Sequence, residues 1–237
     1  FPLRRHSWRL FFAQFIPDGG GGHRIADAIL DASRPPGKPM SRIQRVEVHV
    51  FQFDARNLVP KGGGAVGALH YGAGGSTRLT KYAVRILTAN GLVGEYVTHW
   101  VGSAAALGST IMLAPYLVGR EAEQREGIYD DLKRESRQFD HMGHGPLDIA
   151  LWDLAGRKYG VPVSELLGGY RHRLPTYAST YHAQRGEAGG LNCKEAFGDF
   201  AVACHEMGYR AFKIHGWNEG DKREEAANVL HVRARVG

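Results

Sequence analysis

The order of strand and helix patterns changes near residue 170, and this change restricts the folds open to the chain. Before it, three strand patterns precede three helical patterns, an order typical of a compact α+β domain. After it, strand and helix alternate over residues 174–237, which predicts a parallel sheet with crossover helices. A complete (β/α)₈ barrel needs roughly 200 residues or more. Residues 174–237 therefore accommodate only the first units of a TIM-like barrel.

A three-stranded antiparallel meander is predicted for the first part. Residues 43–54 alternate between apolar and polar side chains, as a half-buried strand does. Residues 79–88 and 92–98 form two more strands, joined by an Asn-Gly pair that favours a tight hairpin. Residues 57–76 lie between the first two strands and are rich in glycine, so we expect a mobile loop there.

Helical patterns complete both parts. In the first part they cover residues 104–117, 121–136 and 146–159, and Ile149, Trp152 and Ala155 form the apolar stripe of the third helix, which Gly160 ends. In the second part we expect strands at residues 174–180 and 209–215 and helices at residues 194–207 and 221–236. Cys204 lies on the apolar face of the first of these helices, which indicates a buried structural thiol.

The strand over residues 209–215 carries the sharpest chemical signal. Side chains alternate across a strand, so Phe212 and Ile214 face the outer helices, and Lys213 and His215 face the barrel interior. Ionisable groups there are costly unless they line a site, and barrel enzymes place catalytic residues at the carboxyl ends of strands. Alternatively, both groups are solvated at a loop boundary, or Lys213 pairs with an acid.

One segment identifies a family. Residues 145–163, followed by Leu166-Leu167-Gly168-Gly169, resemble the signature before the barrel in the mandelate racemase/muconate lactonizing family of the enolase superfamily. The likeness covers about residues 41–237. It implies a capping domain over 41–170 and the incomplete start of a barrel over 171–237. Residues 1–39 keep no regular period, and we expect them to lie outside the fold, either as upstream sequence or as a targeting segment.

The resemblance also implies roles for the two polar strand residues. In this family a Lys-x-Lys pair often ends the second barrel strand. Its second lysine acts as general base on the carbon beside a carboxylate, and the first neutralises that carboxylate. Lys213 and His215 fall on these positions. Histidine replaces the second lysine, and its titration near neutral pH suits proton transfer.

Further contacts follow from the same resemblance. The glycine-rich loop corresponds to a flap over the barrel mouth, with His70 and Tyr71 as substrate contacts, and Ser179 and Thr180 end the strand that often holds the substrate carboxylate. A surface loop without ligand contact and a merely solvated strand end are the alternatives. His141 and His144 lack a third ligand nearby, so we expect a surface turn there and not a metal site.

The implied reaction is metal-dependent abstraction of the proton beside a carboxylate, with dehydration of a sugar-derived acid preferred. By resemblance the metal is Mg²⁺, and its ligands are expected on strands beyond Gly237, so no metal ligand is assigned in this chain and the chain alone is expected to be inactive. Racemisation or epimerisation of a carboxylate is the alternative reaction. A catalytically dead fragment or a binding module is the alternative of a different class.

Charge and composition limit the partners. Half of the net charge of +6 falls in residues 1–39, so the remainder carries no footprint for nucleic acid. The longest apolar stretch, residues 111–118, is too short to cross a membrane. Two cysteines make no disulfide framework, which favours a reduced cytoplasmic setting. We therefore expect a small carboxylate substrate as partner and, for the full-length enzyme, further copies of itself in a homo-oligomer.

Overall fold

The structure is a computed structural model in which the described residues form two compact units. The first unit contains residues 40–51, 81–99 and 103–168, with residue 140 outside the description. The second contains residues 52–60, 69–80, 169–183, 190–217 and 221–237. Residues 1–39 and 61–68, and with them the expectation for the N-terminal segment, lie outside the described residues. The glycine-rich hairpin thus groups with the segment expected to begin the barrel.

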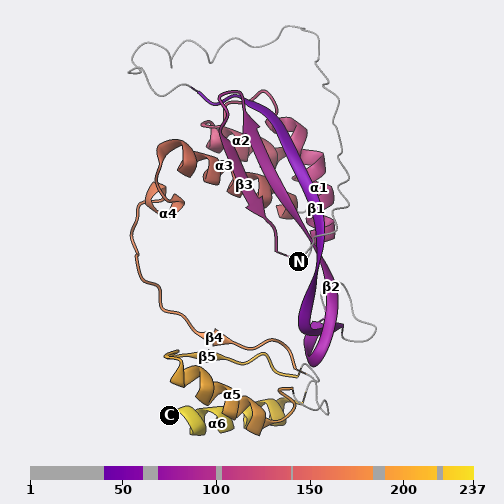
Figure 1. The fold of residues 1–237 in the computed structure, drawn as a ribbon, viewed down its shortest axis with the longest axis vertical. Helices are drawn as coiled ribbons and strands as arrows, with labels where there is room; N and C mark the ends of the chain where they lie inside the picture. Colours follow the sequence, from indigo (N-terminus) through magenta and orange to yellow (C-terminus); the bar gives the residue numbers. More distant parts are fainter. Residues whose placement is uncertain (1–39, 61–68, 100–102, 140, 184–189, 218–220) are drawn as a thin grey trace. The chain divides into compact units, whose positions relative to one another are not determined.

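The predicted meander is confirmed. Strands β1 (Ile43–Pro60), β2 (Leu69–Thr88) and β3 (Val93–Val97) form a sheet in the order β1-β2-β3 (Figure 1). β2 and β3 are antiparallel, with Val84 opposite Tyr96. The turn between them contains Gly91 at φ 82°, a left-handed conformation that glycine adopts without steric cost.

The loop expected over residues 57–76 is wrong for most of its length. β1 continues to Pro60 and β2 begins at Leu69, so the glycine-rich segment is largely a paired hairpin. The Thr77 hydroxyl donates to the Leu58 carbonyl at 2.7 Å, and the Asn57 side chain accepts from the Gly74 amide at 3.0 Å. Because ladder hydrogen bonds involve the backbone, a partner strand can order glycines whose own β-propensity is low.

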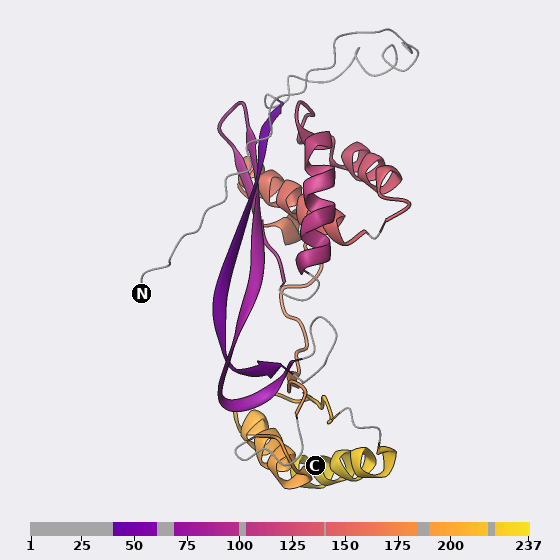
Figure 2. The same ribbon diagram turned by 90° about the vertical axis from the view of Figure 1, so that its right-hand side faces the viewer.

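Helices cover one face of the sheet in the first unit (Figure 2). Pro115 lies in the first turn of η1, where the predicted first helix gives way to a 3₁₀ turn. The predicted end of the third helix is confirmed, because Gly160 caps it at φ 70°. The helical elements of this unit are α1 (Ser103–Leu113), η1 (Ala114–Leu117), α2 (Arg125–Glu135), η2 (His141–Gly143), α3 (His144–Tyr159) and α4 (Val163–Leu166).

The core of the first unit lies between the sheet and α3. Alternate residues of β2 are buried, and they pack against the buried face of α3, which comprises Leu147, Ala150, Leu151 and Leu154. The predicted apolar stripe of this helix is wrong for Ile149, which is 42% exposed, whereas Ala155 is buried and Trp152 half-buried. A period of three residues drifts around a helix of 3.6 residues per turn, and the neighbouring leucines bury more apolar area.

The second unit alternates strand and helix as predicted. It contains β4 (Ala178–Ser179), α5 (Lys194–Glu206), β5 (Phe212–Lys213) and α6 (Lys222–Val236). β4 and β5 pair in parallel, with Ala178 opposite Phe212 and Ser179 opposite Lys213. Both strands are shorter than expected, because only two residues of each join this two-stranded ladder.

The helices of the second unit pack around a small apolar core. Its buried members are Ala183, Phe197, Ala201, Trp217 and Val232. Cys204 is also buried, and burial raises the pKa of its thiol, as expected for a structural cysteine. Within the described part of the chain, every helix is too short or too polar to cross a membrane.

Candidate active site

β5 separates its apolar from its polar side chains. Phe212 and Ile214 pack against the core of the second unit, as predicted for the helix-facing side. The ring of Phe212 meets that of Phe200 on α5 at a centroid distance of 6.1 Å. Lys213 is exposed and His215 is half-buried. The alternation therefore leaves one ammonium and one imidazole away from the apolar core at the end of this strand.

The imidazole of His215 is held by the end of β4. Its Nδ1 lies 2.7 Å from the Thr180 carbonyl oxygen. A carbonyl oxygen only accepts, so Nδ1 must carry the hydrogen of this bond. In the neutral ring, Nε2 is then the nitrogen with a free lone pair. No other described residue makes a hydrogen bond to Nε2, so this nitrogen can serve as a base.

Thr180 joins the two strand ends. Its side chain is 5% exposed. The hydroxyl oxygen accepts the His215 amide at 2.8 Å and lies 3.4 Å from the Lys213 carbonyl, to which it donates. The neighbouring Ser179 is exposed, and its hydroxyl donates to the Thr180 carbonyl at 3.2 Å. Of the two hydroxyls expected to contact substrate, that of Ser179 is the more accessible.

Lys213 has no carboxylate partner among the described residues. Its Nζ lies 5.9 Å from the centre of the Tyr177 ring, near the outer limit of a cation–π contact. An acid that would make this lysine structural is thus missing from the part of the chain that the structure describes. The ammonium is positioned to attract an anion.

The glycine-rich hairpin contacts the end of β4. The Tyr71 amide donates to the His182 carbonyl at 2.8 Å. The side chain of His70 is 3% exposed and that of Tyr71 is half-buried, so Tyr71 is the more accessible of the two expected flap contacts. The His182 ring lies edge-on to the His215 ring at a centroid distance of 4.9 Å. Sequence reasoning missed His182, although its place just after β4 was a signal.

The loop after β5 is fixed from two sides. The Trp217 amide donates to the Glu225 carboxylate at 2.7 Å, and the Trp217 indole donates to the Leu191 carbonyl at 2.8 Å. A Cβ on Gly216 would overlap the Glu225 carboxylate. The first turn of α6 therefore holds the backbone directly after His215, an anchoring role for Glu225 that the sequence did not indicate.

The described residues contain no cluster suited to magnesium. Within the described ranges, no group of three or more His, Cys, Asp or Glu side chains could hold a metal ion. The described acids of the barrel segment lie on helices or at a helix cap, and Glu225 already accepts the Trp217 amide. Mg²⁺ needs several converging oxygen ligands, so the described residues do not fit this ion by themselves.

The surface turn expected at His141 and His144 is wrong for His144. That residue begins α3 and is 5% exposed, and its ring lies 4.6 Å from the Tyr129 ring. Burial lowers the pKa of His144, because the charged imidazolium loses its hydration. The residue belongs to the packing between α2 and α3.

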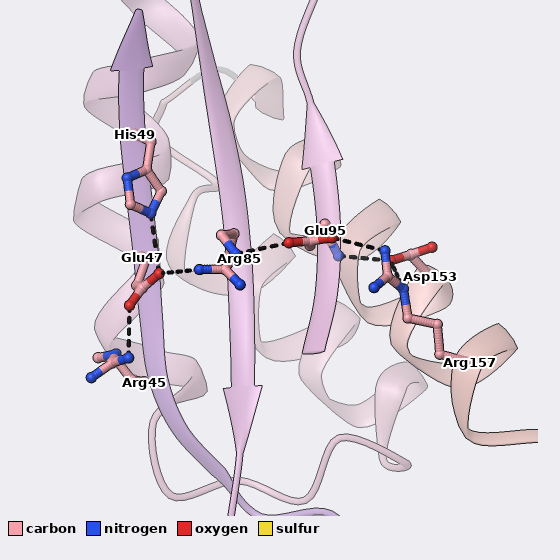
Figure 3. A network of polar contacts seen from close by, with 7 residues as sticks. All are labelled: Arg45, Glu47, His49, Arg85, Glu95, Asp153 and Arg157. Carbon is pink, nitrogen blue, oxygen red and sulfur yellow. Dashed lines mark hydrogen bonds and ion pairs between the residues drawn. The ribbon is translucent and has the colours of Figure 1, made fainter. Parts of the chain in front are cut away.

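A second group of charges lies on the first unit (Figure 3). Arg85 bridges Glu47 at 3.0 Å and Glu95 at 2.8 Å. Arg157 bridges Glu95 at 2.8 Å and Asp153 at 2.9 Å. The hydrogen bond from Arg85 lowers the pKa of Glu95 against the opposing effect of burial. These charges satisfy one another across three strands and α3, so they indicate structure and not a binding site.

Residues 71–168 match the mandelate racemase/muconate lactonizing enzyme family in its N-terminal domain. This part of the chain is similar to that domain, in agreement with its three-stranded sheet and helices. A D-glucarate dehydratase from Agrobacterium tumefaciens, solved in complex with magnesium, superimposes with a TM-score of 0.68 at 27% identity and covers 83% of this chain and 51% of its own. A dipeptide epimerase from Enterococcus faecalis, 20% identical with a TM-score of 0.65 over 83% of this chain and 51% of its own, shares the fold.

Characterised relatives point in the same direction. A D-galactonate dehydratase family member of Streptomyces bingchenggensis is 35% identical over 185 residues, which cover 65% of this chain and 45% of the relative. The D-gluconate dehydratase of Thermoproteus tenax is 30% identical over 65% of this chain and 33% of its own. The 3,6-anhydro-alpha-L-galactonate cycloisomerase of Streptomyces coelicolor is 28% identical over 65% and 43%. The chain thus spans less than half the length of these relatives.

Proposed function

We propose that this chain is part of an enzyme that removes the proton beside the carboxylate of a sugar-derived acid and dehydrates that acid. The observation that carries the proposal is the hydrogen bonding of the His215 imidazole ring. Its Nδ1 is committed to the Thr180 carbonyl, which leaves Nε2 as a base, and the exposed ammonium of Lys213 lies two residues away on the same strand. The relatives named as sugar-acid dehydratases support this choice of reaction.

Each residue has one role in this reaction. The Lys213 ammonium faces the substrate carboxylate and offsets the negative charge that grows when the neighbouring C–H bond breaks. His215 takes that proton on Nε2. The hydroxyl on the next carbon then takes up a proton and departs as water, and its C–O bonding electrons leave with it. The remaining enol rearranges to a 2-keto acid. Ser179 and Tyr71 complete the substrate contacts, together with His70, which is 3% exposed and precedes Tyr71 on β2.

The magnesium in the solved D-glucarate dehydratase supports a divalent cation in the whole enzyme, where it would stabilise the negative charge of the intermediate. The described residues do not provide its ligands, so no step of this chain is assigned to it. A homo-oligomer and a cytoplasmic setting, the latter suggested by the two free cysteines, belong to the same proposal.

Racemisation or epimerisation is the second candidate, and it would begin with the same transfer of the proton to His215 Nε2. Inversion would then require a second group to deliver a proton to the opposite face of the intermediate, because His215 alone would restore the original configuration. The reactions separate at the product: dehydration gives a 2-keto-3-deoxy acid, whereas epimerisation gives an isomer of unchanged mass.

A chimera tests the proposed function. Residues 1–237 would be joined to the segment that follows the matched region in the D-galactonate dehydratase family member of Streptomyces bingchenggensis. With Mg²⁺ and a panel of sugar acids in D₂O, we expect 2-keto-3-deoxy product. His215→Asn should abolish turnover, and Lys213→Met should raise KM and lower kcat. The matched control, Lys133→Met on α2, should leave turnover unchanged. A folded chimera that turns over equally well with His215→Asn would refute the assignment.

A further inference from the structure

We propose that Thr180 is a positioning residue that fixes the tautomer and place of His215, and that it does not bind substrate. The inference rests on the proposed function of His215 as the group that moves the proton. Thr180 was expected to hold a substrate carboxylate, and its contacts point to a different task.

The Thr180 hydroxyl differs from that of Ser179, which also donates within the chain, because it is buried and both donates and accepts a hydrogen bond. A hydroxyl carries one donor hydrogen, and that of Thr180 is directed to the Lys213 carbonyl at 3.4 Å. The oxygen meanwhile accepts the His215 amide at 2.8 Å. A carboxylate only accepts hydrogen bonds. With its donor engaged and its side chain 5% exposed, Thr180 is poorly suited to hold one.

Thr180 forms hydrogen bonds with His215 at two points. Its side chain binds the main chain of His215, and its main-chain carbonyl binds the imidazole Nδ1 at 2.7 Å. Since both contacts come from one residue, the hydroxyl fixes the distance between the carbonyl and the ring. The branched Cβ of threonine restricts rotation about χ1. This restriction keeps the hydroxyl oxygen in position to accept the hydrogen bond from the His215 amide.

The consequence concerns which ring nitrogen is the base. A free imidazole side chain in water carries its proton preferentially on Nε2, which would leave Nδ1 as the base. The Thr180 carbonyl reverses this preference, because it can only accept from Nδ1–H. Nδ1 faces the β4 end, so Nε2 is the nitrogen left to meet a substrate. Thr180 thereby selects the atom that transfers the proton.

Histidine tautomers can be measured directly in this chain. ¹⁵N and ¹³C labelling of the histidines and long-range ¹H–¹⁵N correlation spectra distinguish a protonated from an unprotonated ring nitrogen, and the spectrum of His215→Gln assigns the signals. In the neutral ring of the wild type, we expect the proton on Nδ1. Thr180→Ser should keep this form, whereas Thr180→Val should lose it and move toward the Nε2–H form.

Two additions make the test decisive. Thr110→Val removes a buried hydroxyl that bonds Tyr82 and Gly143 in the first unit, so it should leave the His215 signal unchanged. Thr180→Ala repeats the removal with a smaller side chain if valine disturbs folding. A wild-type ring protonated on Nε2, an unchanged tautomer in both Thr180→Val and Thr180→Ala, or an equal change in Thr110→Val would overturn the proposal. The readout needs no turnover, so it is independent of the chimera's activity.

Discussion

Two lysines distinguish the two units of the molecule. Lys158 in the first unit is 6% exposed and pairs with Glu123, whose side chain is 19% exposed. The Glu123 carboxylate also accepts the Ser41 amide at 3.0 Å. Lys213 in the second unit is exposed, and its ammonium contacts only an aromatic ring within the described ranges. Removing one member of a buried ion pair destabilises a fold, whereas an exposed cation without a carboxylate partner at a strand end is available to an anion.

The two units also differ in what surrounds a closely packed glycine. In the first unit, β3 approaches α3 so closely that a Cβ on Gly94 would lie 2.6 Å from the Leu154 Cβ and 2.9 Å from its amide nitrogen, and would overlap the Ala150 carbonyl. In the second unit, Gly216 meets only the end of the Glu225 side chain. The first unit is constrained by backbone, and the site loop is constrained by a side chain that can move.

Gly94→Ala should have the largest effect on stability. The methyl group meets the backbone of α3, which cannot withdraw without unpacking the core, so we expect a loss of about 3 kcal/mol in the free energy of unfolding. Urea unfolding followed through the fluorescence of Trp152 measures it. Gly108→Ala is the control, because open space surrounds Gly108 inside α1; it should stabilise by about 0.5 to 1 kcal/mol. Equal effects of the two substitutions would contradict the close approach of β3 to α3.

Lys158→Met should cost about 2 kcal/mol, below the figure for a fully buried pair because Glu123 keeps some exposure. The adjacent Arg157→Met removes exposed ion pairs to Glu95 and Asp153 and should cost less than about 1 kcal/mol. Chemical unfolding of both variants measures the difference. A larger loss of unfolding free energy for Arg157→Met than for Lys158→Met would show that Arg157, and not Lys158, is the cation on which the fold depends.

The cost of losing Lys158 should also depend on pH. Burial alone would raise the pKa of Glu123, but hydrogen bonds from Lys158 and Ser41 outweigh it and lower the pKa to about 2. A carboxyl with a lowered pKa in the fold contributes its full stability above its unfolded value, near 4.5, and loses it as the pH falls toward 2. Unfolding curves of wild type and Lys158→Met should therefore converge between these values. A constant difference down to pH 2 would exclude the pair as the cause.

Gly216→Ala should have the smallest effect on stability, about 1 kcal/mol, because the Glu225 side chain can turn away. Its expected effect on the site is larger, since Glu225 would then release the Trp217 amide. Amide exchange at Trp217 should accelerate, whereas exchange in β2 of the first unit should stay unchanged. Protection of Trp217 equal to wild type would show that Glu225 does not anchor this loop.

Sequence reasoning predicted the structural features that follow from local patterns along the chain. The strand at residues 79–88, the stop at Gly160 and the helix-facing side chains Phe212 and Ile214 follow from local patterns, and the structure confirms each. The pairing of the glycine-rich segment was missed because its order comes from contacts between β1 and β2, such as that of Thr77 with Leu58, and not from the β-propensity of its residues. The buried face of α3 was misjudged because leucines adjacent to Ile149 compete for the same core.

For the candidate site, the sequence indicated which side chains leave the apolar face of the strand and not what those side chains contact. Strand phase singled out Lys213 and His215, since apolar neighbours mark the opposite face. The bond that fixes the His215 tautomer joins it to Thr180, 35 positions earlier, and the amide of Tyr71 on β2 donates to His182 across an even longer interval. Such contacts depend on tertiary structure, which residue spacing does not encode.

The most direct test compares the two lysines in one titration. The chain, labelled with ¹⁵N and ¹³C in lysine and histidine, is titrated with D-galactonate and, in parallel, with galactitol, which lacks the carboxylate. We predict saturable shifts of the Lys213 side chain and the His215 ring with galactonate, none with galactitol, and no response of Lys158 to either. Shifts that are absent, or equal for the acid and the alcohol, would contradict a carboxylate site at the ends of β4 and β5.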